Sequence, residues 1–189
     1  MSPFSVRLSP TVGVQVRSLV AAAFTVALVG VSSQAKAQEG GIALGAPAPG
    51  ASVESLDGKA LDLSQYIGKK PVVLEFWATW CPLCTKLEPA FQAAREKYGD
   101  RVSFVSVGVN SNQTPEKQRA YVEEKHLGGT FVFDRGGKAV AAYKAPHTSY
   151  VVVINTEGNV VYTGVGPAQD IEAAISKAFA MGGMGRSGK

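Results

Sequence analysis

The chain has 189 residues, of which 46% are hydrophobic and 18% are charged. This hydrophobic fraction is enough for the core of one globular domain, and it excludes a chain kept disordered by its charge. The net charge is +4, but residues 1–37 contain three of the basic residues and no acidic residue. The remaining chain is close to neutral, so we expect no nucleic-acid binding, which needs a basic folded surface.

The first 37 residues have the pattern of an export signal. An almost wholly apolar run covers residues 19–31 and follows two arginines. The run is shorter than the roughly 20 residues that a membrane-spanning helix needs. Small residues at Ala35 and Ala37 are typical of a signal-peptidase site. We predict a signal peptide over residues 1–37 and a periplasmic or otherwise exported protein, with a retained membrane anchor as the alternative.

The chain beyond the leader begins with short elements. Residues 38–50 are rich in Gly, Ala and Pro, which predicts a linker. The Asp57–Gly58 turn between two apolar stretches predicts a hairpin within residues 53–63. The run VVLEFW at residues 72–77 predicts a buried strand, and apolar residues at helical spacing predict a helix over residues 82–98.

The second half continues the alternation of strands and helices. The expected elements are a strand over 102–109, a helix over 114–125, a strand over 130–134, a helix up to 143, a hairpin of 150–154 and 160–163, and a helix over 170–180. This order predicts one α/β domain over residues 51–180, a mixed sheet flanked by helices with an additional N-terminal hairpin. Residues 181–189 are expected to be a flexible Gly-rich tail.

The informative motif is Cys81-Pro82-Leu83-Cys84, which contains both cysteines of the chain. A disulfide between them would close so small a ring that it adds little stability. The N-terminus of a helix stabilises a thiolate, which lowers the pKa of Cys81 and makes it a nucleophile. Cys84, one turn further, is expected to be more buried and to attack the mixed disulfide.

A purely structural disulfide and half of a zinc site are the alternatives for this pair. Zinc would need two more ligands, and His126 and His147 are the only histidines. We expect no metal and no cofactor.

The segment EFWATWCPLC from Glu75 to Cys84, with Pro89 five residues later, resembles the active-site segment of the thioredoxin superfamily. With the leader and the hairpin, it is similar to the exported TlpA/ResA/CcmG-like thiol–disulfide oxidoreductases. The resemblance covers about Ala46 to Phe179. It implies a thioredoxin fold, Cys81 as nucleophile, Cys84 as resolving cysteine, protein thiols and disulfides as substrates, and a membrane electron donor.

The resemblance also assigns neighbours of the cysteines. Glu75, six residues before Cys81, stands where the family has a buried acid that assists proton transfer to the resolving cysteine. Burial on a strand would raise the pKa of this carboxyl toward neutral pH. A surface-facing glutamate is the alternative. Trp80 and Pro82 flank Cys81 and are expected to contact substrate.

The family has a cis-proline loop opposite the dithiol, and the sequence departs from it. Pro146 is the only nearby proline, whereas counting back six residues from Asn155 reaches Ser149. Either Pro146 serves in a lengthened loop, or Thr148–Ser149 replaces the usual Thr–Pro. A cis bond costs about 3 kcal/mol before serine and about 1 kcal/mol before proline, which favours Pro146 near the site. We expect Pro146, Thr148 and Ser149 to contact substrate.

These features predict an exported, monomeric thiol–disulfide oxidoreductase that reduces protein disulfides. A peroxiredoxin-like peroxidase is one alternative, but it would need Thr or Ser three residues before the nucleophile, where this chain has Ala78. A non-catalytic thioredoxin-fold binding module is the other. It would carry a metal on a dithiol that the missing proline leaves open.

Overall fold

The computed structural model describes residues 40–182. These residues lie within one compact unit. The predicted signal peptide, the first residues of the predicted linker and most of the predicted tail fall outside the described residues. Within residues 40–182, no helix is both long enough and apolar enough to cross a bilayer.

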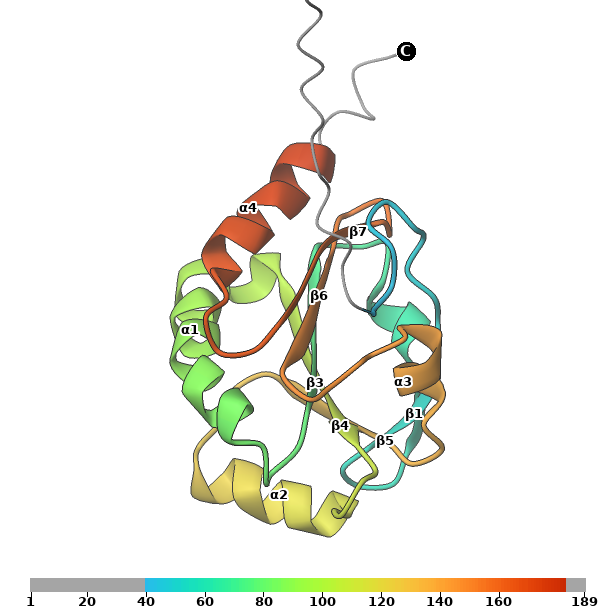
Figure 1. Ribbon diagram of the computed structural model, residues 1–189, viewed down its shortest axis with the longest axis vertical. Helices are drawn as coiled ribbons and strands as arrows, with labels where there is room; N and C mark the ends of the chain where they lie inside the picture. Colours follow the sequence, from blue (N-terminus) through green and yellow to red (C-terminus); the bar gives the residue numbers. More distant parts are fainter. Residues whose placement is uncertain (1–39, 183–189) are drawn as a thin grey trace, which may run out of the picture. The chain divides into compact units, whose positions relative to one another are not determined.

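Strands and helices alternate along the described chain (Figure 1). The strands are β1 (Ser52–Ser55), β2 (Ala60–Asp62), β3 (Val72–Trp77), β4 (Ser103–Val109), β5 (Thr130–Asp134), β6 (Tyr150–Ile154) and β7 (Val160–Val165). The α-helices are α1 (Pro82–Tyr98), α2 (Pro115–Glu124), α3 (Lys138–Ala142) and α4 (Ile171–Gly182). Two short 3-10 helices, η1 (Leu63–Tyr66) and η2 (Gly99–Arg101), complete the described part.

The seven described strands form one sheet in the order β2-β1-β5-β4-β3-β6-β7. Strands β3, β4 and β5 run parallel, whereas β6, β7 and the β1–β2 hairpin pair antiparallel with their neighbours. This arrangement confirms the expected mixed sheet with an additional N-terminal hairpin. The carboxyl ends of parallel strands meet at one end of a sheet, so the loops after β3 and β4 are neighbours there.

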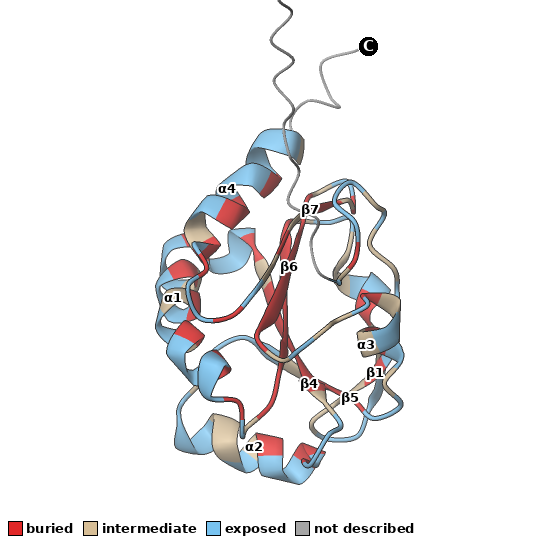
Figure 2. Cartoon of the chain, viewed as in Figure 1, coloured by how far each residue is buried: buried red, intermediate tan, exposed pale blue. Residues whose placement is uncertain are grey.

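Helices cover both faces of the sheet (Figure 1). The buried side chains of α1 and α4 pack with those of β3 and β6 on one face. Those of α3 pack on the other face, together with η1 and the β1–β2 hairpin. Helix α2 packs beside Trp77 at the carboxyl end of β3. The central strands β3 and β6 are buried throughout, and the outward sides of the helices are exposed (Figure 2).

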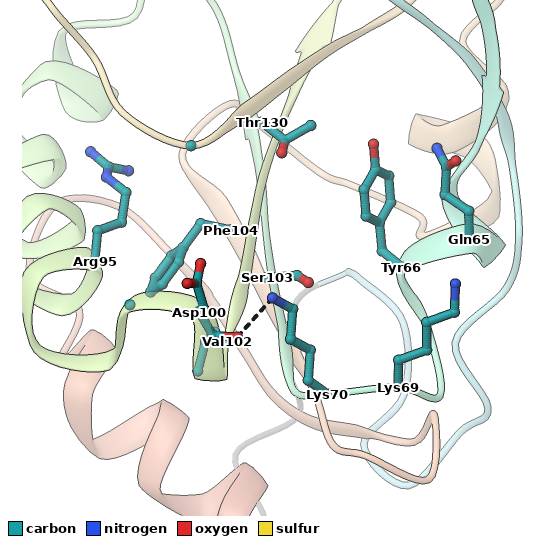
Figure 3. A pocket seen from close by; sticks show the side chains of 12 residues that line it. Gln65, Tyr66, Lys69, Lys70, Arg95, Asp100, Val102, Ser103, Phe104 and Thr130 are labelled. Atoms are coloured by element: carbon teal, nitrogen blue, oxygen red, sulfur yellow. Dashed lines mark hydrogen bonds between the residues drawn. The ribbon is translucent and has the colours of Figure 1, made fainter.

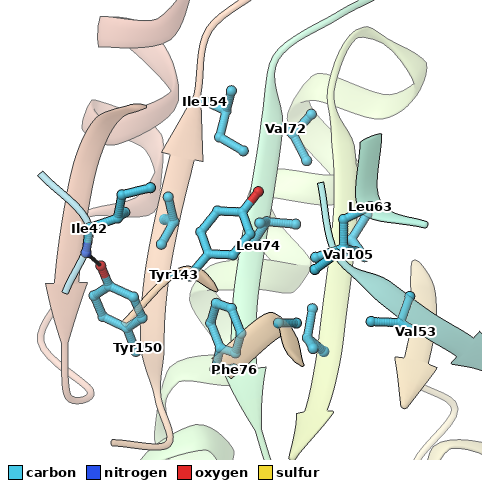
Figure 4. Close-up of a cluster of buried hydrophobic side chains, with 14 of the residues drawn as sticks. Ile42, Val53, Leu63, Val72, Leu74, Phe76, Val105, Tyr143, Tyr150 and Ile154 are labelled. Atoms are coloured by element: carbon cyan, nitrogen blue, oxygen red, sulfur yellow. Dashed lines mark hydrogen bonds between the residues drawn. The ribbon is translucent and has the colours of Figure 1, made fainter. Parts of the chain in front are cut away.

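Residues 40–50, expected to be a linker, instead pack against the domain. Ile42 is buried, and its N–H donates a hydrogen bond of 3.0 Å to the hydroxyl of Tyr150 (Figure 4). Gly41 permits this approach, because a Cβ there would lie 2.5 Å from the Tyr150 oxygen. Backbone hydrogen bonds also join Gly45 to Val160. The small residues of this segment let its backbone pack closely against the domain, so the prediction of a linker from their abundance is wrong for residues 40–50.

Helix α1 begins, packs and ends as its sequence predicts. Pro82 occupies its first turn, where a missing N–H costs nothing. Leu87, Phe91 and Ala94 are buried toward the sheet. Gly99, with a φ of 49°, ends the helix. The helix thereby presents its N-terminus at the carboxyl end of β3.

Candidate active site

Cys81 and Cys84 form a disulfide where β3 passes into α1. Cys81 is the N-cap of the helix, and its sulfur accepts a hydrogen bond of 3.1 Å from the N–H of Cys84. The exposed fractions are 2% for Cys81 and 6% for Cys84, so the expectation that Cys84 would be more buried is wrong. Both cysteines pack in a small buried cluster with Trp77 and Ala78.

The helix terminus is therefore what distinguishes the two sulfurs. The first N–H groups of a helix have no partner within the helix, and they give its N-terminus a partial positive charge. Cys81 lies directly at this terminus, whereas Cys84 lies one turn inside. In the reduced state such a position lowers the pKa of a thiol and makes it the better nucleophile and leaving group.

The loop before Cys81 is held by Gln113, which the sequence analysis missed. The side-chain oxygen of Gln113 accepts a hydrogen bond of 3.0 Å from the N–H of Thr79, and its nitrogen donates to the Trp77 carbonyl over 3.4 Å. The indole N–H of Trp80 donates to the Ser111 carbonyl over 2.8 Å. The loop after β4 thus fixes the loop after β3. Their adjacency follows from the parallel strands, but nothing in the sequence marks Gln113.

The disulfide is bordered by exposed apolar side chains. The exposed fractions of Trp80 and Leu83 are 48% and 39%. Pro82 between them in the sequence is also exposed. Exposed aromatic and aliphatic groups beside a reactive centre favour contact with a partner molecule. We name Trp80, Pro82 and Leu83 the apolar rim.

Glu75 lies inside the protein, on β3. Its exposed fraction is 4%, which excludes the surface-facing alternative. Glu75 and Cys84 line the same cavity, which has a volume of about 270 Å³. Burial raises the pKa of Glu75 to about 8, with a smaller contribution from the charge of Glu88, while Arg95 opposes the shift. A carboxyl group with this pKa exchanges protons near neutral pH.

The loop before β6 contains no cis bond, and neither does any other part of residues 40–182. Ser149 is fully buried and has a φ of 61°. It precedes Tyr150, which pairs with Phe76 at the carboxyl end of β3. Ser149 therefore lies at the same end of the sheet as the cysteine loop, with half-buried Thr148 just before it.

Pro146 lies elsewhere in this loop. A Cβ on Gly40 would be 3.1 Å from the Pro146 ring, which places this proline against the N-terminal segment. The structure thus favours Ser149 over Pro146 for the position opposite the dithiol. Ser149 adopts a left-handed conformation in a trans peptide, and the expected cis bond is absent. Pro146 was favoured because a cis bond costs less before proline, and this reason no longer applies.

Gln169 holds Ser149 in this conformation, and it too was missed from sequence. Its side-chain nitrogen donates to the carbonyls of Ser149, over 3.0 Å, and Gly166, over 2.6 Å. The N–H of Gly166 donates to the Ser149 hydroxyl over 3.1 Å, and the Tyr162 hydroxyl donates to the Gln169 oxygen over 3.1 Å. These bonds satisfy the buried polar groups and fix the loop.

A larger cavity, of about 620 Å³, lies at the other end of the parallel strands, where β3, β4 and β5 begin. Lys69, Lys70 and Arg95 contribute to its wall, and Lys70 donates a hydrogen bond to the Asp100 carbonyl (Figure 3). No cysteine lines it, so it is separate from the disulfide. Within residues 40–182, no group of three or more His, Cys, Asp or Glu side chains is arranged to hold a metal.

Comparison with known proteins agrees with this geometry. Thioredoxin-like protein YneN of Bacillus subtilis is 37% identical over 101 residues, which cover 53% of this chain and 59% of YneN. The thiol-disulfide oxidoreductase ResA of Bacillus thuringiensis is 27% identical over 118 residues, which cover 62% of this chain and 67% of ResA. The chain thus spans about three fifths of YneN and two thirds of ResA.

Solved structures show the same fold. A putative thiol:disulfide interchange protein DsbE from Chlorobium tepidum aligns with a TM-score of 0.63 at 22% identity, covering 75% of this chain and 98% of that one. A putative protein disulfide isomerase from Bacteroides thetaiotaomicron aligns with a TM-score of 0.64 at 24% identity, covering 75% and 92%.

The fold and the paired cysteines define a member of the thioredoxin superfamily that is similar to the ResA and DsbE oxidoreductases. The chain belongs to the Redoxin family, whose model matches residues 43–180.

Proposed function

We propose that the chain is an exported thiol–disulfide oxidoreductase that reduces disulfides in protein substrates. The observation that carries the proposal is the Cys81–Cys84 disulfide at the N-terminus of α1, beside the exposed apolar rim. The names of the similar proteins, ResA and DsbE, support the same chemistry. The rim would contact the substrate chain together with half-buried Thr148 on the loop before β6. The expectation that the Ser149 side chain contacts substrate is wrong, because Ser149 is fully buried and its hydroxyl is bonded to Gly166.

The proposed reaction has two exchange steps. The Cys81 thiolate attacks one sulfur of a substrate disulfide, which forms a mixed disulfide and releases the other substrate sulfur. The Cys84 thiol loses its proton to the Glu75 carboxylate, and its sulfur attacks Cys81. The second substrate sulfur then leaves as a thiolate, which takes up a proton from solvent. Two electrons have passed to the substrate, and Cys81 and Cys84 are again a disulfide.

Each turnover leaves the enzyme oxidised, so an outside donor must return two electrons. We propose a membrane electron donor, because a protein exported by a signal peptide over residues 1–37 is separated from cytoplasmic reductants. The mature protein would begin at residue 38 and act as a monomer on protein thiols and disulfides.

The test is the reduction potential of the cysteine pair in the full chain. The protein is equilibrated in glutathione or dithiothreitol buffers, and its free thiols are trapped and counted. A value below about −230 mV is expected, near that of thioredoxin. A value above about −150 mV would overturn the reducing direction, and the absence of a reversible couple would overturn the enzymatic function.

A further inference from the structure

The cavity beside the disulfide gives buried Glu75 a route for its proton. Glu75 and Cys84 line it together, and its volume of about 270 Å³ has room for several water molecules. Thr85 and Glu88 from α1 also contribute to its wall. Glu75 must be ionised before it can take another proton from Cys84, so its proton returns to Cys84 on reduction or passes to solvent, and this cavity touches both groups.

Glu88 lies between two cavities. A second cavity, of about 410 Å³, shares Glu88, Gln92, Lys125 and Leu127 with the first. Neither Glu75 nor a cysteine lines it, and its wall includes the exposed residue His126, so we name it the outer cavity. Gln92 and Lys125 are exposed too, so the first cavity also reaches the surface. Glu88 carries a titratable carboxyl group in the wall of both cavities.

An ion pair fixes Glu88 at this junction. Arg95, two helical turns further along α1, donates a hydrogen bond to the Glu88 carboxylate. Residues seven apart lie on the same face of a helix. Arg95 also lines the outer cavity and the large cavity at the far end of the sheet, where its side chain is seen in Figure 3.

The charges around Glu75 come from the helical side. Glu88 and Arg95 act on it from α1. Tyr121 of α2 and Lys125, the residue after α2, line the same cavity. On the sheet, the neighbours of Glu75 are Ser106 and Val151, which carry no charge. Glu88 raises the pKa of Glu75 and Arg95 lowers it, so the ion pair balances the two effects.

We propose that Glu88, held by Arg95, is a positioning residue that relays the Glu75 proton between the cavity beside the disulfide and solvent. The inference rests on the proposed function. The Cys84 thiol gives its proton to the Glu75 carboxylate as its sulfur attacks Cys81. Glu75 passes that proton, through water in the cavity, to the Glu88 carboxylate, which releases it outside. No electrons move in the relay, and Arg95 keeps its charge.

The test measures the resolving step alone. The reduced full chain is mixed with 5,5′-dithiobis(2-nitrobenzoate) in a stopped-flow instrument across pH 5–10. Attack by Cys81 releases one coloured thiolate, and attack by Cys84 releases the second. We expect Glu88→Gln to slow the second phase about tenfold and leave the first unchanged. Glu88→Asp, which keeps a titratable group, should recover much of the rate.

The direction of the pH shift shows whether Glu88 and Arg95 act on Glu75 through their charges, and the rate loss in Glu88→Gln with recovery in Glu88→Asp tests the relay itself. Glu88→Gln removes a negative charge and leaves Arg95 unopposed, so the midpoint of the second phase should move to lower pH. Arg95→Gln leaves the Glu88 charge unopposed, so the midpoint should move to higher pH. Carbon-13 NMR of the Glu75 carboxyl group should show the same opposite shifts without any turnover.

The matched control is Glu172→Gln, which breaks an exposed ion pair between α4 and Lys97 of α1. It should change neither phase. If wild type shows two phases and Glu88→Gln leaves the second unaltered, the relay is overturned. Shifts of the same sign in Glu88→Gln and Arg95→Gln would overturn it too. If wild type shows no second phase, the proposed function itself fails.

Discussion

The N–H of Cys84 lies 3.1 Å from the sulfur of Cys81 and donates a hydrogen bond to it. A sulfur that caps a helix in this way is stabilised as an anion once the disulfide opens. Both cysteines are buried, so this contact is the asymmetry on which their proposed roles rest.

The first prediction separates these roles. Cys81→Ser should abolish disulfide reduction, because no thiolate remains at the helix terminus. Cys84→Ser should accumulate a mixed disulfide with substrate on Cys81, because nothing resolves it. Mass spectrometry under non-reducing conditions measures the adduct. Full turnover by Cys81→Ser would refute the assignment of the nucleophile.

The second prediction concerns stability and pH. The pKa of Glu75 is about 8 in the folded protein and 4.5 without the fold, so the folded state binds an additional proton between these values. The free energy of unfolding of the oxidised protein should therefore fall as pH rises from about 5 to 8, by up to about 1.4 kcal/mol per pH unit. Below pH 4.5 both states are protonated, and this contribution to the slope vanishes.

Glu75→Gln removes the titrating group, so the slope between pH 5 and 8 should become much flatter. Urea unfolding at several pH values measures it, with Glu172→Gln as the control for a lost surface carboxylate. Equal slopes in wild type and Glu75→Gln would show that Glu75 is ionised in the folded protein throughout this range.

The third prediction tests the apolar rim. Trp80→Ala removes the largest exposed side chain next to Cys81, and large aromatic anchors contribute strongly to protein contacts. We expect KM for a protein disulfide to rise about tenfold. The rate with a small aromatic disulfide should change less, and only through the lost indole hydrogen bond to Ser111. Equal losses with both substrates would mean that Trp80 acts on the cysteines and not on docking.

The fourth prediction addresses the loop before β6, at the same end of the sheet as the cysteine loop. Ser149 has a φ of 61°, whereas proline is fixed near −65°. Ser149→Pro should therefore destabilise the protein by about 3 kcal/mol or more. Ser149→Gly suits the left-handed backbone but loses the hydroxyl that accepts from Gly166, so its change should stay within about 1 kcal/mol. Thermal unfolding compares them, and a fully stable Ser149→Pro would show that the loop readily adopts another conformation.

The fifth prediction concerns Gln113, which joins the loops after β3 and β4. Gln113→Ala leaves the N–H of Thr79 without its partner and should cost about 1–3 kcal/mol of unfolding free energy. The reduction potential should change as well, because the cysteine loop loses its support. Gln65→Ala, at an exposed glutamine, is the control and should be near neutral. If Gln113→Ala changed the unfolding free energy as little as Gln65→Ala does, Gln113 would not stabilise the cysteine loop.

Much of this architecture could be predicted from local patterns. The apolar runs of β3, β4 and β6, the helical spacing in α1 and the Asp57–Gly58 turn all depend on neighbours in sequence, which periodicity detects. The cysteine motif was visible for the same reason. The burial of Glu75 followed from its place in an otherwise apolar strand.

The unpredicted features depend on contacts between distant parts of the chain. Gln113 bonds to Thr79 and Gln169 bonds to Ser149 across 34 and 20 positions, and a glutamine in a loop carries no sign of such a partner. The φ of Ser149 is stabilised by those bonds and not by its own preference. Residues 40–50 pack through backbone groups, which composition does not reveal.

Neither edge of the described sheet presents a long unpaired strand. On one side the last strand, β2, has three residues, and on the other the N-terminal segment lies along the start of β7, with Pro47 bridging to Asn159. Long unpaired edges invite any extended polypeptide to add itself as another strand. An oxidoreductase that reduces unfolded protein substrates, as proposed here, would bind such extended polypeptides. Short and covered edges would let it release each substrate without forming a shared β-sheet with it.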